Sequence, residues 1–168
     1  MTEPTNTDET VNDVILASSS EHHQHTFQLI QSATRSIYIH CHDLTPRIYN
    51  HPDIAAALSQ FVISNSANRT VKISVNDVQT IVSCDHKVLD TCRRLTSNIS
   101  IHKIAPQHAS HTESFMIIDE KILLTRTDYT LFDGSVRYNP KQAKEMLNLF
   151  NEIWSHSQSD SNLNRLYI

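Results

Sequence analysis

Glycine is almost absent from this chain. The sequence contains a single glycine, Gly134, among 168 residues, whereas average usage is about 7%. Loops that cradle a phosphate group need several glycines, because only glycine lets the backbone approach the ligand closely. The sequence therefore excludes the glycine-rich phosphate-binding loops found in many nucleotide-binding proteins.

Paired cysteines are also missing. The three cysteines, Cys41, Cys84 and Cys92, are an odd number and show no Cys-x-x-Cys spacing. This pattern favours neither a disulfide framework nor a thiolate zinc site. We expect reduced, partly buried thiols that pack as small apolar side chains.

Long apolar runs and basic runs are absent as well. No apolar run approaches the roughly 18 residues that span a membrane, and the first 13 residues are polar and acidic, without a secretory signal pattern. The sequence therefore predicts a cytoplasmic protein with no membrane span. Asp and Glu (18) outnumber Lys and Arg (14), for a net charge of -4. Because nucleic-acid affinity comes largely from basic side chains on phosphates, this balance argues against a nucleic-acid partner.

The composition that remains is that of one globular domain, with 39% hydrophobic and 19% charged residues. Residues 1–14 predict a disordered acidic tail, and residues 15–168 a single domain. Ser18 and Glu21 fit a capping box at the start of a first helix. Alternating or helical periodicity then predicts a strand at 36–42, a helix from Pro52, a strand around 71–75, a helix capped by Asp85, a strand at 98–104, a hairpin, and a last helix after Asn139-Pro140. The terminal residues 166–168 are expected to dock back on the domain. This order predicts an α/β sandwich with a mixed sheet flanked by helices.

The hairpin is the most informative stretch. The apolar run Phe115-Met116-Ile117-Ile118 leads into the polar turn Asp119-Glu120-Lys121, and a second apolar run follows. In outline this stretch resembles the signature of phospholipase D-like phosphodiesterases, His-x-Lys-x4-Asp-x6-Gly-Ser-x-Asn. The order of elements resembles one domain of that family. Segments 43–49, 149–154 and 163–168 resemble a bacterial branch whose function is uncharacterised and whose members are sometimes joined to acetyltransferases.

The reactive residues of that signature are replaced. With the aspartate placed on Asp119, the histidine falls on Thr112, the lysine on Ser114, and the Gly-Ser pair on Arg126-Thr127. The family's mechanism needs a histidine nucleophile, a lysine that neutralises phosphoryl oxygens, and a second histidine as general acid. The resemblance therefore implies a non-catalytic relative with no catalytic residue in place, in which Asp119 is a turn residue.

His111 leaves a second interpretation open. A slip of one residue would place this histidine at the nucleophile position, but neighbouring strand side chains point to opposite faces. A bulge before Phe115 would have to restore its direction, and the lysine position would then hold Glu113, whose charge has the wrong sign. The alternative function is a weak phosphodiesterase or nuclease that uses His111.

Four residues are candidates for binding: His42, Arg47, His111 and Arg126. Arg126 takes the family's glycine position, where it either binds an anion or, as we favour, plugs the pocket by pairing with Glu113 or Asp119. Arg47 is the other candidate for an anion. His42 lies at the carboxyl end of a strand, where ligands bind in open α/β sheets, although a loop cap is the commoner explanation.

Eleven histidines raise the question of a metal. His22, His23 and His25 lie near a helix start, and His40 and His42 share one face of a strand, a spacing that can serve a metal. Because no acidic or thiolate partner accompanies them at a typical spacing, we expect scattered histidines, no metal and no cofactor. Ser135, in Asp133-Gly134-Ser135, is expected in a turn, since no nucleophile elbow flanks it.

Three functions follow from these patterns. The leading hypothesis is a non-catalytic binding or assembly module that forms a homodimer, because single-motif members of the resembled family correspond to half of an active unit. The second is the His111-dependent phosphodiesterase. The third is regulation of an acetyltransferase or another protein partner.

Overall fold

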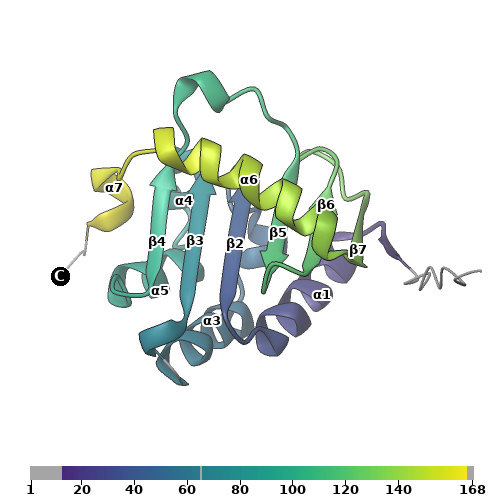
Figure 1. Ribbon diagram of the computed structural model, residues 1–168. Coiled ribbons are helices and arrows are strands. Elements are labelled where there is room, and N and C mark those ends of the chain that lie inside the picture. Colours follow the sequence, from purple (N-terminus) through teal and green to yellow (C-terminus); the bar gives the residue numbers. More distant parts are fainter. Residues whose placement is uncertain (1–12, 65, 166–168) are drawn as a thin grey trace, which may run out of the picture.

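The computed structural model describes residues 13–64 and 66–165. Within these residues the centre of the molecule is a seven-stranded mixed sheet in the order β1-β7-β6-β5-β2-β3-β4 (Figure 1). β2, β3 and β4 are parallel, and β5, β6, β7 and β1 continue the sheet through antiparallel pairings. The strands are Val14–Leu16 (β1), Ser36–Cys41 (β2), Thr70–Val75 (β3), Ile99–Lys103 (β4), Ser114–Ile118 (β5), Ile122–Arg126 (β6) and Gly134–Tyr138 (β7).

Helices cover both faces of this sheet, as the alternation of strands and helices predicts. The long helix α6 lies across one face, whereas α1 and α3 pack on the other (Figure 1). The helices are Ser19–Ser32 (α1), Pro46–Tyr49 (α2), Pro52–Ser64 (α3), Val78–Ser83 (α4), Lys87–Arg94 (α5), Pro140–His156 (α6) and Ser161–Asn164 (α7), and short 3-10 turns occupy Ser66–Asn68 and Pro106–His108. The predicted α/β sandwich with a mixed sheet is confirmed. No helix in the described part of the chain combines the length and apolarity that crossing a bilayer requires.

Two apolar layers hold the sandwich together. On the α6 face, Phe150 is fully buried among Phe115, Ile117 and Leu123 of the hairpin. On the other face, α1 and α3 cover the strand residues that point away from α6, such as Ile37 and Ile39. Truncation of a fully buried phenylalanine lowers the free energy of unfolding by about 3–5 kcal/mol. We therefore expect the apolar stripe of α6 to hold this helix on the sheet.

Local capping signals located the helix starts well. Ser18 caps α1, with Glu21 N donating to Ser18 Oγ at 3.2 Å and the Glu21 carboxylate accepting from the Ser18 and Ala17 amides. Asn139 caps α6 by accepting from Gln142 N, with Pro140 at the first position. Both predicted caps are confirmed, because each depends on residues within one helical turn.

Two local predictions were wrong, and one short helix was not predicted. Asp85 does not cap α5: His86 takes that position, and Asp85 instead pairs with Lys87 at 3.6 Å. The short helix is α4, which Asp77 caps through Thr80 N. Gly134 and Ser135 belong to β7 and not to a turn.

The glycine is required at that point because a Cβ atom on Gly134 would lie 2.1 Å from Thr125 O. Close backbone approach, not turn geometry, therefore explains the single glycine. Most of the predicted tail (1–12) and the docking segment (166–168) lie outside the described residues; Val14, at the end of the tail range, opens β1, and Asp13 pairs with Arg137 at 2.8 Å.

Asp119 lies in the turn between β5 and β6 and accepts several hydrogen bonds there. Its carboxylate accepts hydrogen bonds from the backbone amides of Thr34, Arg35 and Ser36 at 2.7–3.1 Å and from the Thr34 hydroxyl at 2.9 Å. Asp119 and Glu120 have positive φ angles of 53° and 59°, as tight hairpin turns often require. The one motif residue that the chain keeps thus joins the β5–β6 turn to the start of β2.

Replacement of Asp119 by asparagine tests this role. Burial raises the pKa of Asp119, but the hydrogen bonds from Ser36, Arg35 and Thr34 outweigh it, and the pKa is lowered overall. The carboxylate therefore stabilises the fold above its ordinary pKa, and this contribution is lost as pH falls through the lowered value. We expect Asp119→Asn to reduce the free energy of unfolding by about 2 kcal/mol at pH 7, measured by urea denaturation. The difference from the parent protein should shrink below about pH 4; a difference that does not depend on pH would contradict the assignment.

Candidate functional site

Ser114, Arg126 and Gly134 lie side by side on the neighbouring strands β5, β6 and β7. We call these three residues the motif row. Because β5 and β6 are antiparallel, Ser114 pairs directly with Arg126, and Arg126 pairs with Gly134 on the next strand. The row lies at the edge where the parallel strands β2 and β3 end (Figure 1). Hairpin register thus brings together the position of the family's lysine, Ser114, and that of its glycine, Arg126.

Arg126 fills the space beside this row. The side chain is 3% exposed. Its Nε donates to Leu131 O, one Nη donates to Tyr129 O, and the other donates to Thr45 Oγ1 at 2.9 Å. The guanidinium carbon also lies 4.8 Å from the centre of the Phe132 ring, within the range of a cation–π interaction. One side chain therefore holds the loop that joins β6 to β7 and ties it to the segment before α2.

The partners of Arg126 differ from those predicted. Its hydrogen bonds go to two carbonyl oxygens and a hydroxyl, whereas Asp119 is bound to amides at the other end of the hairpin. Glu113 is exposed. Burial lowers the pKa of Arg126, an effect opposed by Tyr49 and Asp43, but an arginine keeps its charge in proteins. Among residues 13–64 and 66–165, the structure thus places a cation in the site without a carboxylate hydrogen-bonded to it.

Helix α1 closes the same site with a histidine. His22 is 1% exposed, and its Nε2 lies 2.9 Å from Phe132 O. A Cβ atom on Gly134 would lie 2.8 Å from the His22 ring. Burial lowers the pKa of His22, although the bond to Phe132 O opposes the shift. Neutral His22 therefore packs against the row and holds the same loop as Arg126.

The space left among these groups is very small. A cavity of about 10 Å³ remains, which we call the Arg126 pocket; it is lined by His22, Thr26, Cys41, Tyr49, Ser114 and Arg126, among others. A cavity needs about 10–15 Å³ for the centre of one water molecule. The Arg126 pocket therefore has room for at most a water molecule and none for a phosphoryl group. Burial raises the pKa of the Cys41 thiol to about 12, so this sulfur is not a thiolate nucleophile at neutral pH.

His42 covers this edge from outside. Its ring stacks on Tyr129 with centroids 3.8 Å apart and an interplanar angle of 11°. Tyr129 N donates to Thr112 O at 3.0 Å. The structure therefore brings two of the predicted binding residues, His42 and Arg126, together through Tyr129.

His111 belongs to a different group of side chains. Its ring centre lies 6.4 Å from that of His40 and 6.1 Å from that of His108. His40 stacks on Phe115, a residue of the apolar layer under α6, whereas Ser114 lines the pocket on the α1 side. Burial, and then the nearby His111 and His108, lower the pKa of His40 to about 4. His111 is in the loop before β5, and its ring lies near that of His40; it does not line the Arg126 pocket, which Ser114 does.

Arg47 does not join the other candidates. It lies exposed on α2, beside a shallow hollow that His23 and His51 also line. Arg126 contacts this part of the chain through Thr45, whose hydroxyl accepts a hydrogen bond from its guanidinium group.

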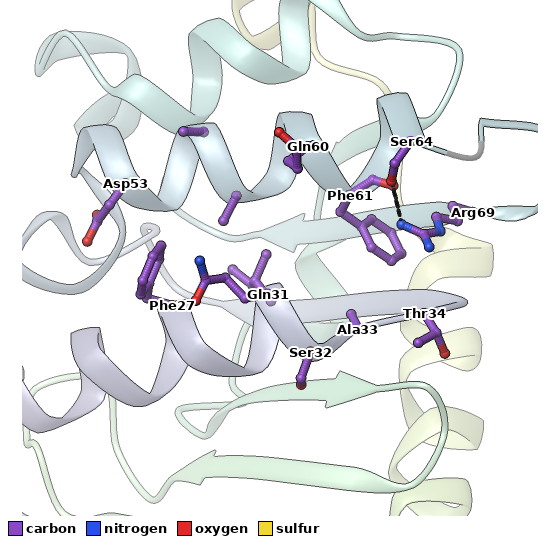
Figure 2. Close-up of a pocket in the computed structure, with 13 residues that line it drawn as sticks. Phe27, Gln31, Ser32, Ala33, Thr34, Asp53, Gln60, Phe61, Ser64 and Arg69 are labelled. Carbon is purple, nitrogen blue, oxygen red and sulfur yellow. Dashed lines mark hydrogen bonds between the residues drawn. The ribbon is translucent and has the colours of Figure 1, made fainter.

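Sequence reasoning missed a larger groove between α1 and α3. It has a volume of about 640 Å³ and is lined by apolar side chains, including Phe27 and Phe61, together with polar ones such as Gln31 and Gln60. Figure 2 shows Asp53 at one end of the groove and Arg69 at the other, with Arg69 bonded to Ser64. Neither the hairpin motif nor the four candidate binding residues line it. Its small residues, such as Ala56, occur in a helix that periodicity marks only as amphipathic.

Solved structures share this fold. Nuc from Salmonella typhimurium, a phospholipase D family member, superposes with a TM-score of 0.61 at 17% identity, over 87% of this chain and 97% of Nuc. NucT from Helicobacter pylori gives a TM-score of 0.62 at 13% identity, over 88% and 98% of the two chains. TrmBL2, an archaeal chromatin protein, gives 0.64 at 12% identity over 87% of this chain and 53% of its own.

These likenesses define the class of the fold: a phospholipase D-like α/β domain. The family described as "Domain of unknown function (DUF7931)" matches residues 18–166, so the chain belongs to this family. No curated protein sequence matches the chain.

Substitution of Arg126 tests whether it holds the loop. A lysine keeps the charge but cannot donate to Tyr129 O, Leu131 O and Thr45 Oγ1 at once. We expect Arg126→Lys to lower the free energy of unfolding by about 2–4 kcal/mol and to speed chymotrypsin cleavage within residues 127–133.

The matched control is Arg137→Lys on the neighbouring strand, where the arginine is half-buried and pairs with Asp13. Surface pairs contribute less than about 1 kcal/mol, so this variant should behave like the parent protein. Equal effects of the two substitutions would show that Arg126 has no special role.

Proposed function

We propose that this chain is a non-catalytic phospholipase D-like domain that acts as a binding or assembly module. The observation that carries the proposal is the filled site: Arg126 and His22 leave a cavity of about 10 Å³ beside the motif row. Phosphodiester cleavage requires a phosphoryl group to sit against the nucleophile and the groups that neutralise its charge. The Arg126 pocket does not provide that space.

The side chains at the motif positions support the same proposal. Thr112, at the histidine position, is exposed, and its carbonyl is used by Tyr129 N. Ser114, at the lysine position, is buried and uncharged. The guanidinium group of Arg126 donates hydrogen bonds to carbonyl oxygens of the loop that follows it. Fixed hydrogen bonds of this kind stabilise a loop and are not free to follow a reacting phosphate.

A binding role has a parallel among the structural neighbours. TrmBL2 is described by a novel mode of DNA binding, so this fold occurs in a protein known by what it binds. We do not extend DNA binding to the present chain, because its net charge is -4 and nucleic-acid affinity depends on basic contacts with phosphates.

The partner that we propose first is a second copy of the chain, as the phospholipase D resemblance implies. Sedimentation velocity of the full chain distinguishes the cases: a dimer supports the assembly role, and a monomer across the accessible concentration range removes this part of the proposal.

An acetyltransferase or another protein is the second proposed partner, and capture from the native cell by the full chain, compared with an Arg126→Lys variant, tests it.

The alternative function is a phosphodiesterase that uses His111. Its exposure and the nearby His108 favour this reading, because two histidines are what the chemistry needs. His111 does not line the Arg126 pocket, however, whereas Ser114 and Arg126 do.

An assay with bis-p-nitrophenyl phosphate separates the two functions. We expect the parent protein to release no more p-nitrophenol than buffer does, at any pH between 5 and 8. The control variants are His111→Ala and His25→Ala, the second on α1 and outside the His111 group. Turnover that His111→Ala abolishes and His25→Ala retains would overturn the non-catalytic proposal.

A further inference from the structure

Two histidines and an aspartate meet on the surface that α1 shares with the start of α3. One ligand atom from each of His23, His51 and Asp53 lies within 4.8 Å of the other two, and all three residues are half-buried. His23 Nε2 is 3.0 Å from both carboxylate oxygens of Asp53. The rings of His23 and His51 stack with centroids 3.9 Å apart. Residues from α1, the α2–α3 loop and α3 thus converge on one point.

The hydrogen bonds around the group leave a ring-nitrogen lone pair of His51 available. His51 Nε2 is 2.9 Å from Arg47 O. A carbonyl oxygen only accepts, so this bond places the ring proton on Nε2 and leaves the lone pair on Nδ1. Metal-binding histidines commonly donate their second ring N–H to a backbone carbonyl in this way, which fixes the tautomer and the ring orientation. Asp53 is itself held, because Oδ1 accepts from Ile54 N at 2.7 Å.

The spacing suits a small divalent ion. Zinc binds imidazole nitrogen and carboxylate oxygen at about 2.0–2.2 Å, so two ligand atoms of a tetrahedral site lie about 3.3 Å apart. The 3.0 Å separation of His23 Nε2 and Asp53 Oδ1 is already close to this value, and an ion would replace the proton between them. The side chains of His23 and Asp53 remain 24% and 40% exposed, so an ion and a completing water have access from solvent.

We propose that His23, His51 and Asp53 form a binding site for a divalent transition-metal ion, with zinc as the representative ion. Two imidazoles, one carboxylate and one water make a four-coordinate site with an open position. This proposal revises the expectation of scattered histidines. The sequence places His23 far from its two partners, and only the packing of α1 on α3 brings them together.

The location gives such an ion a structural consequence. Asp53 also lines the groove between α1 and α3, at the end opposite Arg69 (Figure 2). An ion bound by His23 and Asp53 would tie the two groove-forming helices to each other at that end. Metal binding is therefore expected to stabilise the folded chain and to fix the width of the groove.

Zinc titration of the full chain, without a histidine tag, tests the site. Competition against a chromophoric chelator should reveal one tightest equivalent of zinc. His51→Ala and Asp53→Asn should each weaken that equivalent by at least about tenfold. Zinc should raise the thermal unfolding midpoint of the parent protein, because it binds only the folded arrangement, and the rise should be lost in both variants.

His108→Ala is the matched control, since His108 lies 3.3 Å from His156 in a separate histidine pair. It should bind zinc as the parent protein does. The proposal is overturned if the parent protein binds no zinc, if both His51→Ala and Asp53→Asn retain its affinity, or if His108→Ala loses as much. Circular dichroism establishes folding, and Asp53→Asn, which preserves side-chain shape, decides the matter if His51→Ala does not fold.

Discussion

The hydrogen bonds of Arg126 are the interaction on which this end of the molecule depends. The guanidinium group satisfies two loop carbonyls and the Thr45 hydroxyl from a buried position at the end of β6. A buried cation is costly unless it is fully hydrogen-bonded, so the loop, α2 and the Phe132 ring are all arranged around it. His22 then reaches the same loop from α1. Arg126 and His22 together fill the space at this end of the phospholipase D-like frame.

The scarcity of glycine has shaped the rest of the chain. Within the described residues, three non-glycine residues have positive φ: Leu44, Asp119 and Glu120. Such conformations are disfavoured for residues with a Cβ atom, and hydrogen bonds hold two of these residues. Asp119 binds three successive amides, and Leu44 O lies 2.8 Å from His86 Nε2. Gly134 is kept where backbone and ring leave no room for a Cβ.

The sequence predicted the fold better than the site, for physical reasons. Helix caps at Ser18 and Asn139 and the apolar hairpin are local patterns, and the structure confirms them. Three features of the site were not predicted. His22 and Thr26 belong to the buried stripe of α1. Because these two residues are polar, a search for apolar periodicity does not identify them as buried. The partners of Arg126 are backbone carbonyls, which no side-chain pattern reveals, and His51 and Asp53 reach His23 only through tertiary packing.

The central claim is that Arg126 fills the site and that its guanidinium is already occupied. The Arg126 Nε–H group, which donates to Leu131 O, reports this directly in a ¹⁵N NMR spectrum, and an Arg126→Lys spectrum assigns its signal. We predict slow exchange of this proton with solvent and no movement of its signal, or of the Ser114 amide signal, as inorganic phosphate is added. A saturable shift of both signals would show that the site opens to a phosphoryl group, and would contradict the account.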